Sequence, residues 1–190
     1  TEMPGLRIVP TGPDLVGAEL ELVPESERER RLEQSLHALS DVDYIVIDCP
    51  PSLGLLTVNA LVAASEIIVP VQCEYYALEG LSHLLRTLDL VRGRFNPQLS
   101  LGGLVLTMYD RRNRLTHQVE DEVMSYFGPS VFQTRIPRNV RLSESPSFGK
   151  PALLYDANAA GTQAYLELAA EVIARHLPTT PALSQGATNV

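Results

Sequence analysis

The stretch of sequence from Tyr44 to Gly54 constrains the fold of this chain more than any other. It begins with an apolar, partly β-branched run at residues 44–47, which is typical of a parallel strand buried on both faces. The run ends on Asp48, and two prolines and a glycine follow soon after. Because an open α/β sheet binds its ligands beyond the carboxyl ends of its strands, Asp48 falls where a ligand site is expected.

Strand and helix signals alternate along the chain. The expected strands are at 6–9, 44–48, 66–71, 101–108 and 131–134, the expected helices are at 15–22, 26–39, 55–64, 77–95, 115–127 and 159–177, and a loop with one helical turn is expected at 136–150. This alternation indicates crossover units, and hence an α/β fold with a mostly parallel sheet and helices on both faces. We expect one domain over residues 1–177 and a disordered polar tail over residues 178–190.

Composition excludes several classes of protein. The chain has 190 residues, of which 45% are hydrophobic and 20% are charged, and this balance suits a globular domain with a sizeable core. No apolar run approaches the ~18 residues that span a membrane. The two cysteines, Cys49 and Cys73, are too few for a disulfide framework or a four-ligand metal site, so we expect reduced thiols in the cytoplasm.

The net charge of −8 is unevenly distributed. Residues 1–48 contain eleven acidic residues and four arginines, whereas residues 49–190 contain twelve acidic and eleven basic residues. Seven of these basic residues fall in one short window: Arg111, Arg112, Arg114, Arg135, Arg138, Arg141 and Lys150. An acidic protein can therefore carry one basic face, although a scattered, solvated surface is the alternative.

The residue types that follow the run at 44–47 suit a nucleotide site. Asp48 supplies a carboxylate of the kind that holds a hydrated Mg²⁺ beside phosphates. Pro50 and Pro51 restrict the backbone after it, and Gly54 allows a close backbone approach. Such a segment could sense a terminal phosphate, as a switch loop does. A helix N-cap at Asp48 with a rigid turn after it is the alternative that the pattern leaves open.

Two further clusters, at residues 107–112 and 136–141, follow the last two expected strands, so the same sheet edge should present both. Met108 and Pro137 offer flat apolar contact, and Asn139 has an amide that can read the edge of a base. Arg112 and Arg141 could contact phosphates outside the site. Taken singly, each of these residues is equally compatible with an ordinary surface or packing role.

Four ordered motifs resemble the ParA family of chromosome and plasmid partition ATPases, which belongs to the deviant Walker, MinD-like group of P-loop NTPases. The motifs are Asp48-Cys-Pro-Pro-Ser-Leu-Gly54, Gln72-Cys-Glu-Tyr-Tyr-Ala-Leu-Glu-Gly80, Thr107-Met-Tyr-Asp110 and Ile136-Pro-Arg-Asn-Val-Arg-Leu-Ser-Glu144. The resemblance runs from about Pro4 to His176. It implies ATP and Mg²⁺ as cofactors, an ATP-dependent homodimer, binding to nucleoid DNA without sequence preference, and hydrolysis stimulated by a ParB-type centromere-binding protein in the cytoplasm.

The resemblance also implies roles for single residues. Asp48 matches the Walker B acid, which holds Mg²⁺ through water, and the segment from Pro50 through Pro51 to Gly54 matches switch II. The positions of Met108, Pro137 and Asn139 match the adenine-side loops of the family. Arg112 and Arg141 match positions where the family carries DNA-contacting arginines.

One departure from the family concerns activity. The chain contains no Gly-x-x-x-x-Gly-Lys-Ser/Thr loop, and its only lysine is Lys150. We therefore expect that the N-terminal Walker A segment of the family is absent, that the chain alone neither binds ATP tightly nor hydrolyses it, and that it is aggregation-prone. The alternative is a non-catalytic module that keeps dimerisation and DNA contacts. A MinD-like membrane role would need a basic amphipathic C-terminal helix, but residues 178–190 carry no charge.

Overall fold

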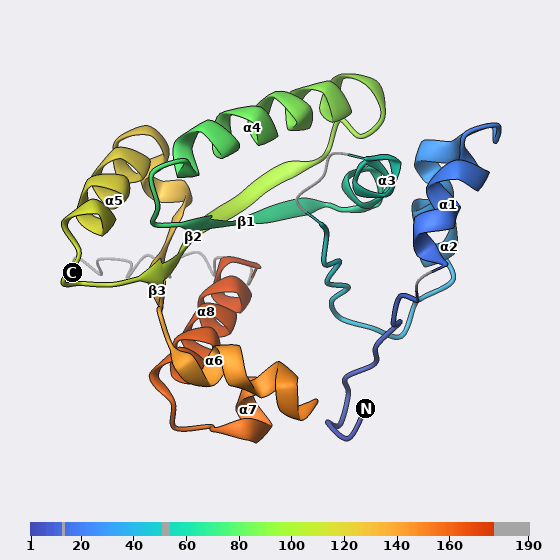
Figure 1. The fold of residues 1–190 in the computed structure, drawn as a ribbon. Helices are drawn as coiled ribbons and strands as arrows, with labels where there is room; N and C mark the ends of the chain where they lie inside the picture. The colour runs from blue at the N-terminus through green and yellow to red at the C-terminus, as the bar shows by residue number, and fades with distance from the viewer. Residues whose placement is uncertain (13, 51–53, 177–190) are drawn as a thin grey trace, which may run out of the picture. The chain divides into compact units, whose positions relative to one another are not determined.

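The computed structural model describes residues 1–12, 14–50 and 54–176 (Figure 1). Along the chain its elements are α1 (Leu15–Leu22), η1 (Arg28–Arg30), α2 (Arg31–Leu36), α3 (Leu55–Ala63), β1 (Glu66–Gln72), α4 (Ala77–Arg94), β2 (Ser100–Tyr109), α5 (Arg114–Phe127), η2 (Gly128–Ser130), β3 (Val131–Pro137), α6 (Val140–Glu144), η3 (Ser145–Phe148), α7 (Ala152–Tyr155) and α8 (Ala160–His176). The elements form two compact units, Thr1–Ile68 with Glu79–Gly102, and Val69–Leu78 with Gly103–Val190. The expected single domain stays a prediction, and the tail at 178–190 lies outside the described residues.

In the first unit, a buried asparagine joins α3 to η1 and α2. The side chain of Asn59 donates from Nδ2 to the carbonyl oxygens of Arg28 at 2.8 Å and Leu55 at 3.0 Å. Its Oδ1 accepts from the backbone N–H of Leu32 at 3.1 Å. Asn59 is only 3% exposed, so these bonds satisfy polar groups that water does not reach.

The apolar core of the first unit lies between α3, α4 and the chain that leads into β2. Its buried members are Leu61, Val62, Leu88, Val91 and Leu99. Asn96 closes one end of this core, because its Nδ2 donates to the carbonyl oxygens of Leu61, Val62 and Ala64 at 3.1, 3.0 and 2.7 Å. These are carbonyls that the last turn of α3 leaves without helical partners.

The second unit is built on a parallel sheet in the order β1-β2-β3. β2 pairs with β3, with Leu104 opposite Val131 and Tyr109 opposite Pro137. Phe132 of β3 contacts α8 and Arg135 contacts α5. Side chains alternate across a strand, so α5 and α8 cover opposite faces of β3, as Figure 1 shows. The predicted parallel α/β architecture with helices on both faces is confirmed.

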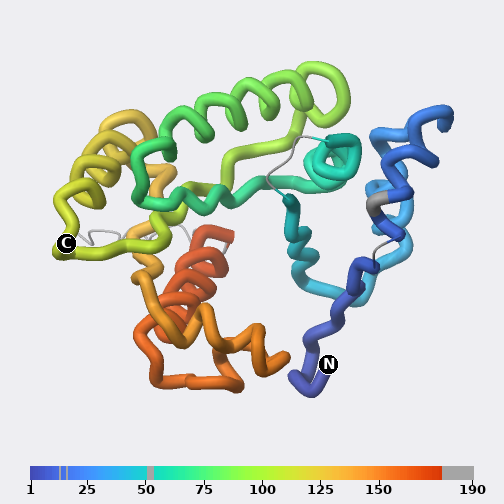
Figure 2. Tube along the Cα trace, viewed as in Figure 1, coloured from blue at the N-terminus to red at the C-terminus, as the bar shows by residue number. Residues whose placement is uncertain are grey.

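The chain after β3 returns to that strand. It passes through α6, η3 and α7 and then runs beside β3 as α8, a path that can be followed in Figure 2. Side chains of β2, β3 and α5 fill the interior here, and the most deeply buried are Leu104, Leu106, Val123, Val131 and Phe132. This packing holds the carboxyl ends of β2 and β3 in a defined register.

The prediction of a buried strand at residues 44–48 is wrong for this structure. These residues form no strand, and Ile45 and Val46 are 45% and 91% exposed. A strand forms only beside neighbours that satisfy its N–H and C=O groups, and in the described chain the sheet contains β1, β2 and β3 alone. The expected strand at 6–9 is absent for the same reason, and Val9 is 91% exposed.

Three smaller differences follow from backbone geometry. The helix expected at 26–39 starts only at Arg28, because Glu27 has a left-handed φ of 52°, and it is divided into η1 and α2, because Arg30 between them has a non-helical backbone with φ −108° and ψ 5°. β3 continues to Pro137, past the expected end at Thr134. The expected loop at 136–150 contains α6, whose first turn Asn139 caps, followed by η3. Across the described residues, no helix has the length and apolar character that crossing a membrane requires.

Candidate functional site

The carboxyl ends of the three strands meet at one edge of the sheet in the second unit. The N–H of Cys73, just after β1, donates to the carbonyl oxygen of Thr107 at 3.2 Å. The N–H of Arg138, just after β3, donates to the carbonyl oxygen of Tyr109 at 3.1 Å. The structure thus brings the clusters at 107–112 and 136–141 together, at the edge where an α/β sheet presents a site.

An open pocket of about 580 Å³ lies at this edge. Tyr109, Asp110 and Arg112 line it from the end of β2, and Pro137 and Arg138 line it from the end of β3. The first turns of α8 complete the wall. Several arginines around an open depression suit an anionic ligand.

Of the two predicted apolar contact residues, Pro137 is among the residues that line the pocket, whereas Met108 is not. Met108 has a positive φ of 52° and is 37% exposed, and the β2–β3 register shifts between Leu106 and Tyr109. A non-glycine residue in this region costs of order 1–3 kcal/mol, and such strain is concentrated at functional positions. Pro137 is half-buried on the neighbouring strand. The side chain of Met108 is therefore turned to solvent beside the strand that carries Pro137.

Asn139 has one half of its amide already in use. Its Oδ1 accepts from the N–H of Arg141 at 2.9 Å, which makes Asn139 the N-cap of α6. Among the described residues, no hydrogen bond is formed by its Nδ2 group. The cap orients the amide, so Asn139 can donate to an acceptor nitrogen of a base but has less capacity to accept from an amino group.

Both predicted phosphate-contacting arginines are exposed and loosely held by carboxylates. Arg112 is 92% exposed in its side chain, and its Nε lies 3.2 Å from Asp110 Oδ1. Arg141 lies 2.9 Å from Glu144 and 3.5 Å from Asp156. Hydrogen bonds from the Arg112 backbone and side chain lower the pKa of Asp110. Exposed ion pairs of this kind are weak, so either guanidinium can leave its partner for a phosphate.

A polar network under the pocket was not predicted from the sequence. Glu120 of α5 accepts a short hydrogen bond from the Tyr109 hydroxyl and another from Arg135 Nε at 2.9 Å. Burial, the Glu120 hydrogen bond and the Glu120 charge together raise the pKa of Tyr109 to about 12. Burial would raise the pKa of Glu120, but the bonds from Tyr109 and Arg135 outweigh it and lower that pKa. Glu120 therefore ties the end of β2 to β3.

Sequence signals for this network were weak. A single acidic residue in an amphipathic helix is usually a solvated surface group, and its partners lie 11 and 15 positions away. Cys73, which we predicted to be an ordinary reduced thiol, is 4% exposed nearby, and burial and the Glu120 charge raise its pKa to about 11. Cys73 is therefore a protonated, unreactive thiol at neutral pH.

The residues predicted for the metal side belong to the first unit. Asp48 and Pro50 are exposed in a segment that is neither helix nor strand, and Pro51 lies outside the described residues. Gly54 begins α3, and a Cβ there would collide with the carboxylate of Glu19, which accepts from the N–H of Leu56 at 3.2 Å. Gly54 thus makes room for the end of a flexible side chain of α1, which could move aside for a larger residue.

The described residues fit a nucleotide only in part. Asp48 is a carboxylate of the type that binds Mg²⁺ through water, and the donor of Asn139 suits a purine edge. No group of three potential metal ligands gathers within residues 1–12, 14–50 and 54–176. Lys150, the only lysine, is exposed after Gly149.

Comparison of the sequence with known proteins finds relatives over nearly the whole chain. A model of the AAA domain matches residues 1–101. The chromosome partitioning protein ParA of Myxococcus xanthus is 54% identical over 95% of this chain and 64% of its own length. ParA of Caulobacter vibrioides is 55% identical over 92% of this chain and 67% of its own length. The sporulation initiation inhibitor protein Soj of Bacillus subtilis is 54% identical over 92% of this chain and 69% of its own length. The chain thus spans about two thirds of these relatives.

Solved structures share the fold. Cobyrinic acid a,c-diamide synthase from Mycobacterium smegmatis, with bound ADP and magnesium, matches with a TM-score of 0.67 and 37% identity, over 83% of this chain and 57% of that one. The cell division ATPase MinD from Pyrococcus furiosus matches with a TM-score of 0.62 and 25% identity, over 77% of this chain and 58% of that one. These matches agree with a P-loop NTPase architecture.

Proposed function

We propose, since this chain belongs to the ParA family of chromosome-partitioning ATPases, that its residues form the adenine-side, metal-side and DNA-facing parts of an ATP- and Mg²⁺-dependent partition protein. The observation that carries the proposal is the meeting of the two motif clusters at the carboxyl ends of β2 and β3. A ligand at that edge would meet a base-reading amide and exposed arginines together. We also propose that the complete protein forms a homodimer, interacts with a ParB-type partner and associates with the nucleoid.

On the adenine side, Met108 and Pro137 would both contact the base, either on its two faces or on one face and one edge. Asn139 would donate from Nδ2 to a ring nitrogen. The N-cap bond to the Arg141 N–H supports this assignment, because it holds the amide in one orientation. On the metal side, Asp48 would hold a water of Mg²⁺. Mg²⁺, when bound, neutralises phosphate charge. The segment from Pro50 to Gly54 would change its conformation according to whether Mg²⁺ is bound.

Binding to nucleotide tests the adenine side directly. Because the chain contains no lysine-bearing phosphate loop, we expect adenosine and ATP with Mg²⁺ both to bind weakly, with ATP only modestly tighter through Asp48 and Mg²⁺; amide chemical shifts in NMR titrations follow the binding. Asn139→Ala should weaken both ligands, whereas Asp48→Ala should weaken ATP alone, and only when Mg²⁺ is present. ATP binding at least 100-fold tighter than adenosine would show that residues 1–190 possess a phosphate cradle of their own. Unchanged binding in Asn139→Ala would refute the adenine-side assignment.

Binding to DNA tests the basic face. Arg112 and Arg141 would contact backbone phosphates, which gives affinity without base preference and a strong dependence on salt. In the complete, ATP-bound dimer, Arg112→Ala or Arg141→Ala should weaken binding equally on unrelated sequences and reduce the salt slope by about 0.9 for each lost phosphate contact. Arg86→Ala, an exposed arginine of α4 in the other unit, serves as the charge-matched control. An equal effect of the control would show that net charge, not the two arginines, governs binding.

A further inference from the structure

The strand β3 contains a bulge whose backbone groups leave the sheet. Leu104 of β2 lies opposite Val131, but Leu106 lies opposite Arg135. Two steps along β2 therefore correspond to four steps along β3, and the register shifts between them. A bulge frees backbone N–H and C=O groups from the ladder, and these groups need other partners when they are shielded from water.

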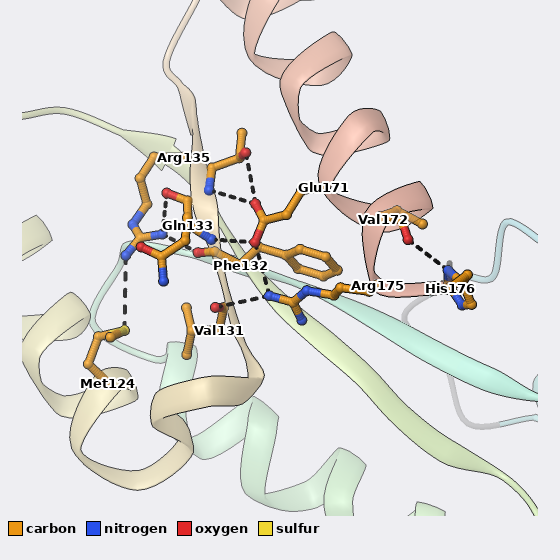
Figure 3. Close-up of polar contacts among 10 residues, drawn as sticks. Met124, Val131, Phe132, Gln133, Arg135, Glu171, Val172, Arg175 and His176 are labelled. Carbon is orange, nitrogen blue, oxygen red and sulfur yellow. Dashed lines mark hydrogen bonds and ion pairs between the residues drawn. The ribbon is translucent and has the colours of Figure 1, made fainter. Parts of the chain in front are cut away.

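The freed N–H groups are bound by one carboxylate of α8. Glu171 Oε1 accepts from the N–H of Gln133 at 2.8 Å, and its Oε2 accepts from the N–H of Thr134 at 3.0 Å. Oε2 also accepts from the Thr134 hydroxyl at 2.9 Å. Figure 3 shows the carboxylate facing these donors from α8. Both oxygens of Glu171 are thus used on the backbone of a single strand segment.

Carbonyl groups in and next to the bulge are bound by two arginines. Arg175 of α8 donates from Nη2 to the Val131 carbonyl oxygen at 3.2 Å. Arg135 donates from Nη1 to the carbonyl oxygens of Phe132 and Gln133, the latter at 2.8 Å. These two N–H groups and three carbonyl groups therefore have charged partners, which make the stronger kind of hydrogen bond.

Glu171 and Arg175 also hold each other in place. They lie 3.0 Å apart at a spacing of four residues, with side chains 20% and 28% exposed. The Arg175 guanidinium lies 3.8 Å above the ring of Phe132. Burial would raise the pKa of Glu171, but the hydrogen bonds from Gln133 and Thr134 outweigh it and lower that pKa. The carboxylate is consequently ionised and immobilised at neutral pH.

Gly103 of β2 makes room for this arrangement. A Cβ at Gly103 would lie 2.5 Å from Phe132 Cε2 and 2.8 Å from Arg175 Nη1, and its φ of 158° is one that other residues rarely adopt. The stacked ring and guanidinium therefore occupy space that only glycine leaves open. Three elements, β2, β3 and α8, therefore meet around the Arg175 guanidinium and the Phe132 ring.

We infer that Glu171 and Arg175 act as a substitute strand that seals the outer edge of β3 against strand addition by a second copy of this chain. β3 is an edge strand of the described sheet, and an edge that presents unpaired N–H and C=O groups is a template for pairing with another molecule. The N–H of Arg138 points to Tyr109 of β2, so the backbone groups of Val131 and Gln133, an odd number of positions earlier, point to the opposite side of β3. There the side chains of Glu171 and Arg175 occupy a donor and an acceptor that an incoming strand would use.

The test compares the 190-residue chain with Glu171→Ala, Glu171→Gln and the matched control Glu167→Ala, which removes an exposed acid one turn earlier on α8. NMR hydrogen exchange reports the amides of Gln133 and Thr134. We expect exchange at least tenfold faster in Glu171→Ala and a smaller increase in Glu171→Gln, which keeps one acceptor oxygen. Circular dichroism confirms that each variant is folded. Unchanged exchange at both amides, or an equal increase in the control, would overturn the inference.

Sedimentation velocity then measures self-association relative to the parent chain and the control. Glu171→Ala should shift the distribution towards dimers and larger species. Adding Gln133→Lys, a charge on the exposed edge itself, should reverse that shift. No increase in association in Glu171→Ala would refute the sealing role, as would association that Gln133→Lys leaves in place, because the contact would then lie elsewhere.

Discussion

Replacing Glu120 by glutamine should change stability in a way that depends on pH. Glu120 accepts hydrogen bonds from Tyr109 and from Arg135, and its side chain is 21% exposed. Glutamine keeps the shape and one acceptor oxygen but removes the charge. At pH 7 the variant should lose about 1–2 kcal/mol, the difference between a charged and a neutral acceptor.

The pH dependence follows from the two shifted groups. The pKa of Glu120 is lowered from its ordinary 4.5, so its contribution to stability is present above pH 4.5 and is lost as the pH falls through the lowered value. The pKa of Tyr109 is raised from 10.0 to about 12, so its contribution is present below pH 10 and is lost as the pH rises towards 12. A shift of about two pKa units corresponds to about 3 kcal/mol. Burial of Tyr109 is the largest cause of its raised pKa. Tyr109 should therefore keep part of this shift in the Glu120→Gln variant.

Urea unfolding between pH 3 and pH 12 measures the effect. The free energy of unfolding of the parent minus that of Glu120→Gln should form a plateau between about pH 5 and pH 10 and shrink on both sides. Glu122→Gln removes the same charge from an exposed position on α5 and should show no such plateau. A difference that stays constant from pH 3 to pH 12 would refute the coupling of Glu120 to Tyr109 and Arg135.

Three further outcomes are expected. Ellman's reagent at pH 8 should label Cys49 in the folded chain, because Cys49 is exposed, although partial burial of its thiol and the Asp48 charge raise its pKa and slow the reaction. Cys73 should react only after unfolding, because it is buried and its pKa is raised to about 11; labelling of both thiols in the folded chain would contradict this. Asn59→Ala should cost about 2–4 kcal/mol in urea unfolding, because it leaves the N–H of Leu32 and a buried carbonyl without partners. Gly103→Ala should cost about 1–3 kcal/mol, because a Cβ there overlaps the packed ring behind it; a cost below 0.5 kcal/mol, roughly that of an ordinary surface substitution, would show that the ring moves aside freely.

The adenine-side residues show how far sequence reasoning reached into the candidate site. Met108, Pro137 and Asn139 could be chosen from their position after strand signals and from the family motifs, and the structure places them at adjoining strand ends. The sequence did not indicate that the side-chain oxygen of Asn139 accepts the hydrogen bond that caps α6, or that Met108 has a positive φ. Both facts depend on how β3 and α6 meet. The role of each residue towards nucleotide stays a prediction.

The sequence by itself determined the elements whose patterns are local. Residues of α3, α4 and α5 have helical spacing, and β1 and β2 have apolar runs between turn signals, so their positions agree closely with expectation. Tertiary structure alone decided whether the apolar run at 44–47 would join a sheet, because a strand needs partners distant in the sequence, and the described residues supply none beside it. The tertiary structure alone also decided the partners of two acids on helix surfaces. Glu120 binds Tyr109 and Arg135 at the ends of β2 and β3, and Glu171 binds backbone N–H groups of β3. No local pattern encodes a hydrogen bond across 37 residues, because only the packing of α8 on β3 brings the donor and the acceptor together.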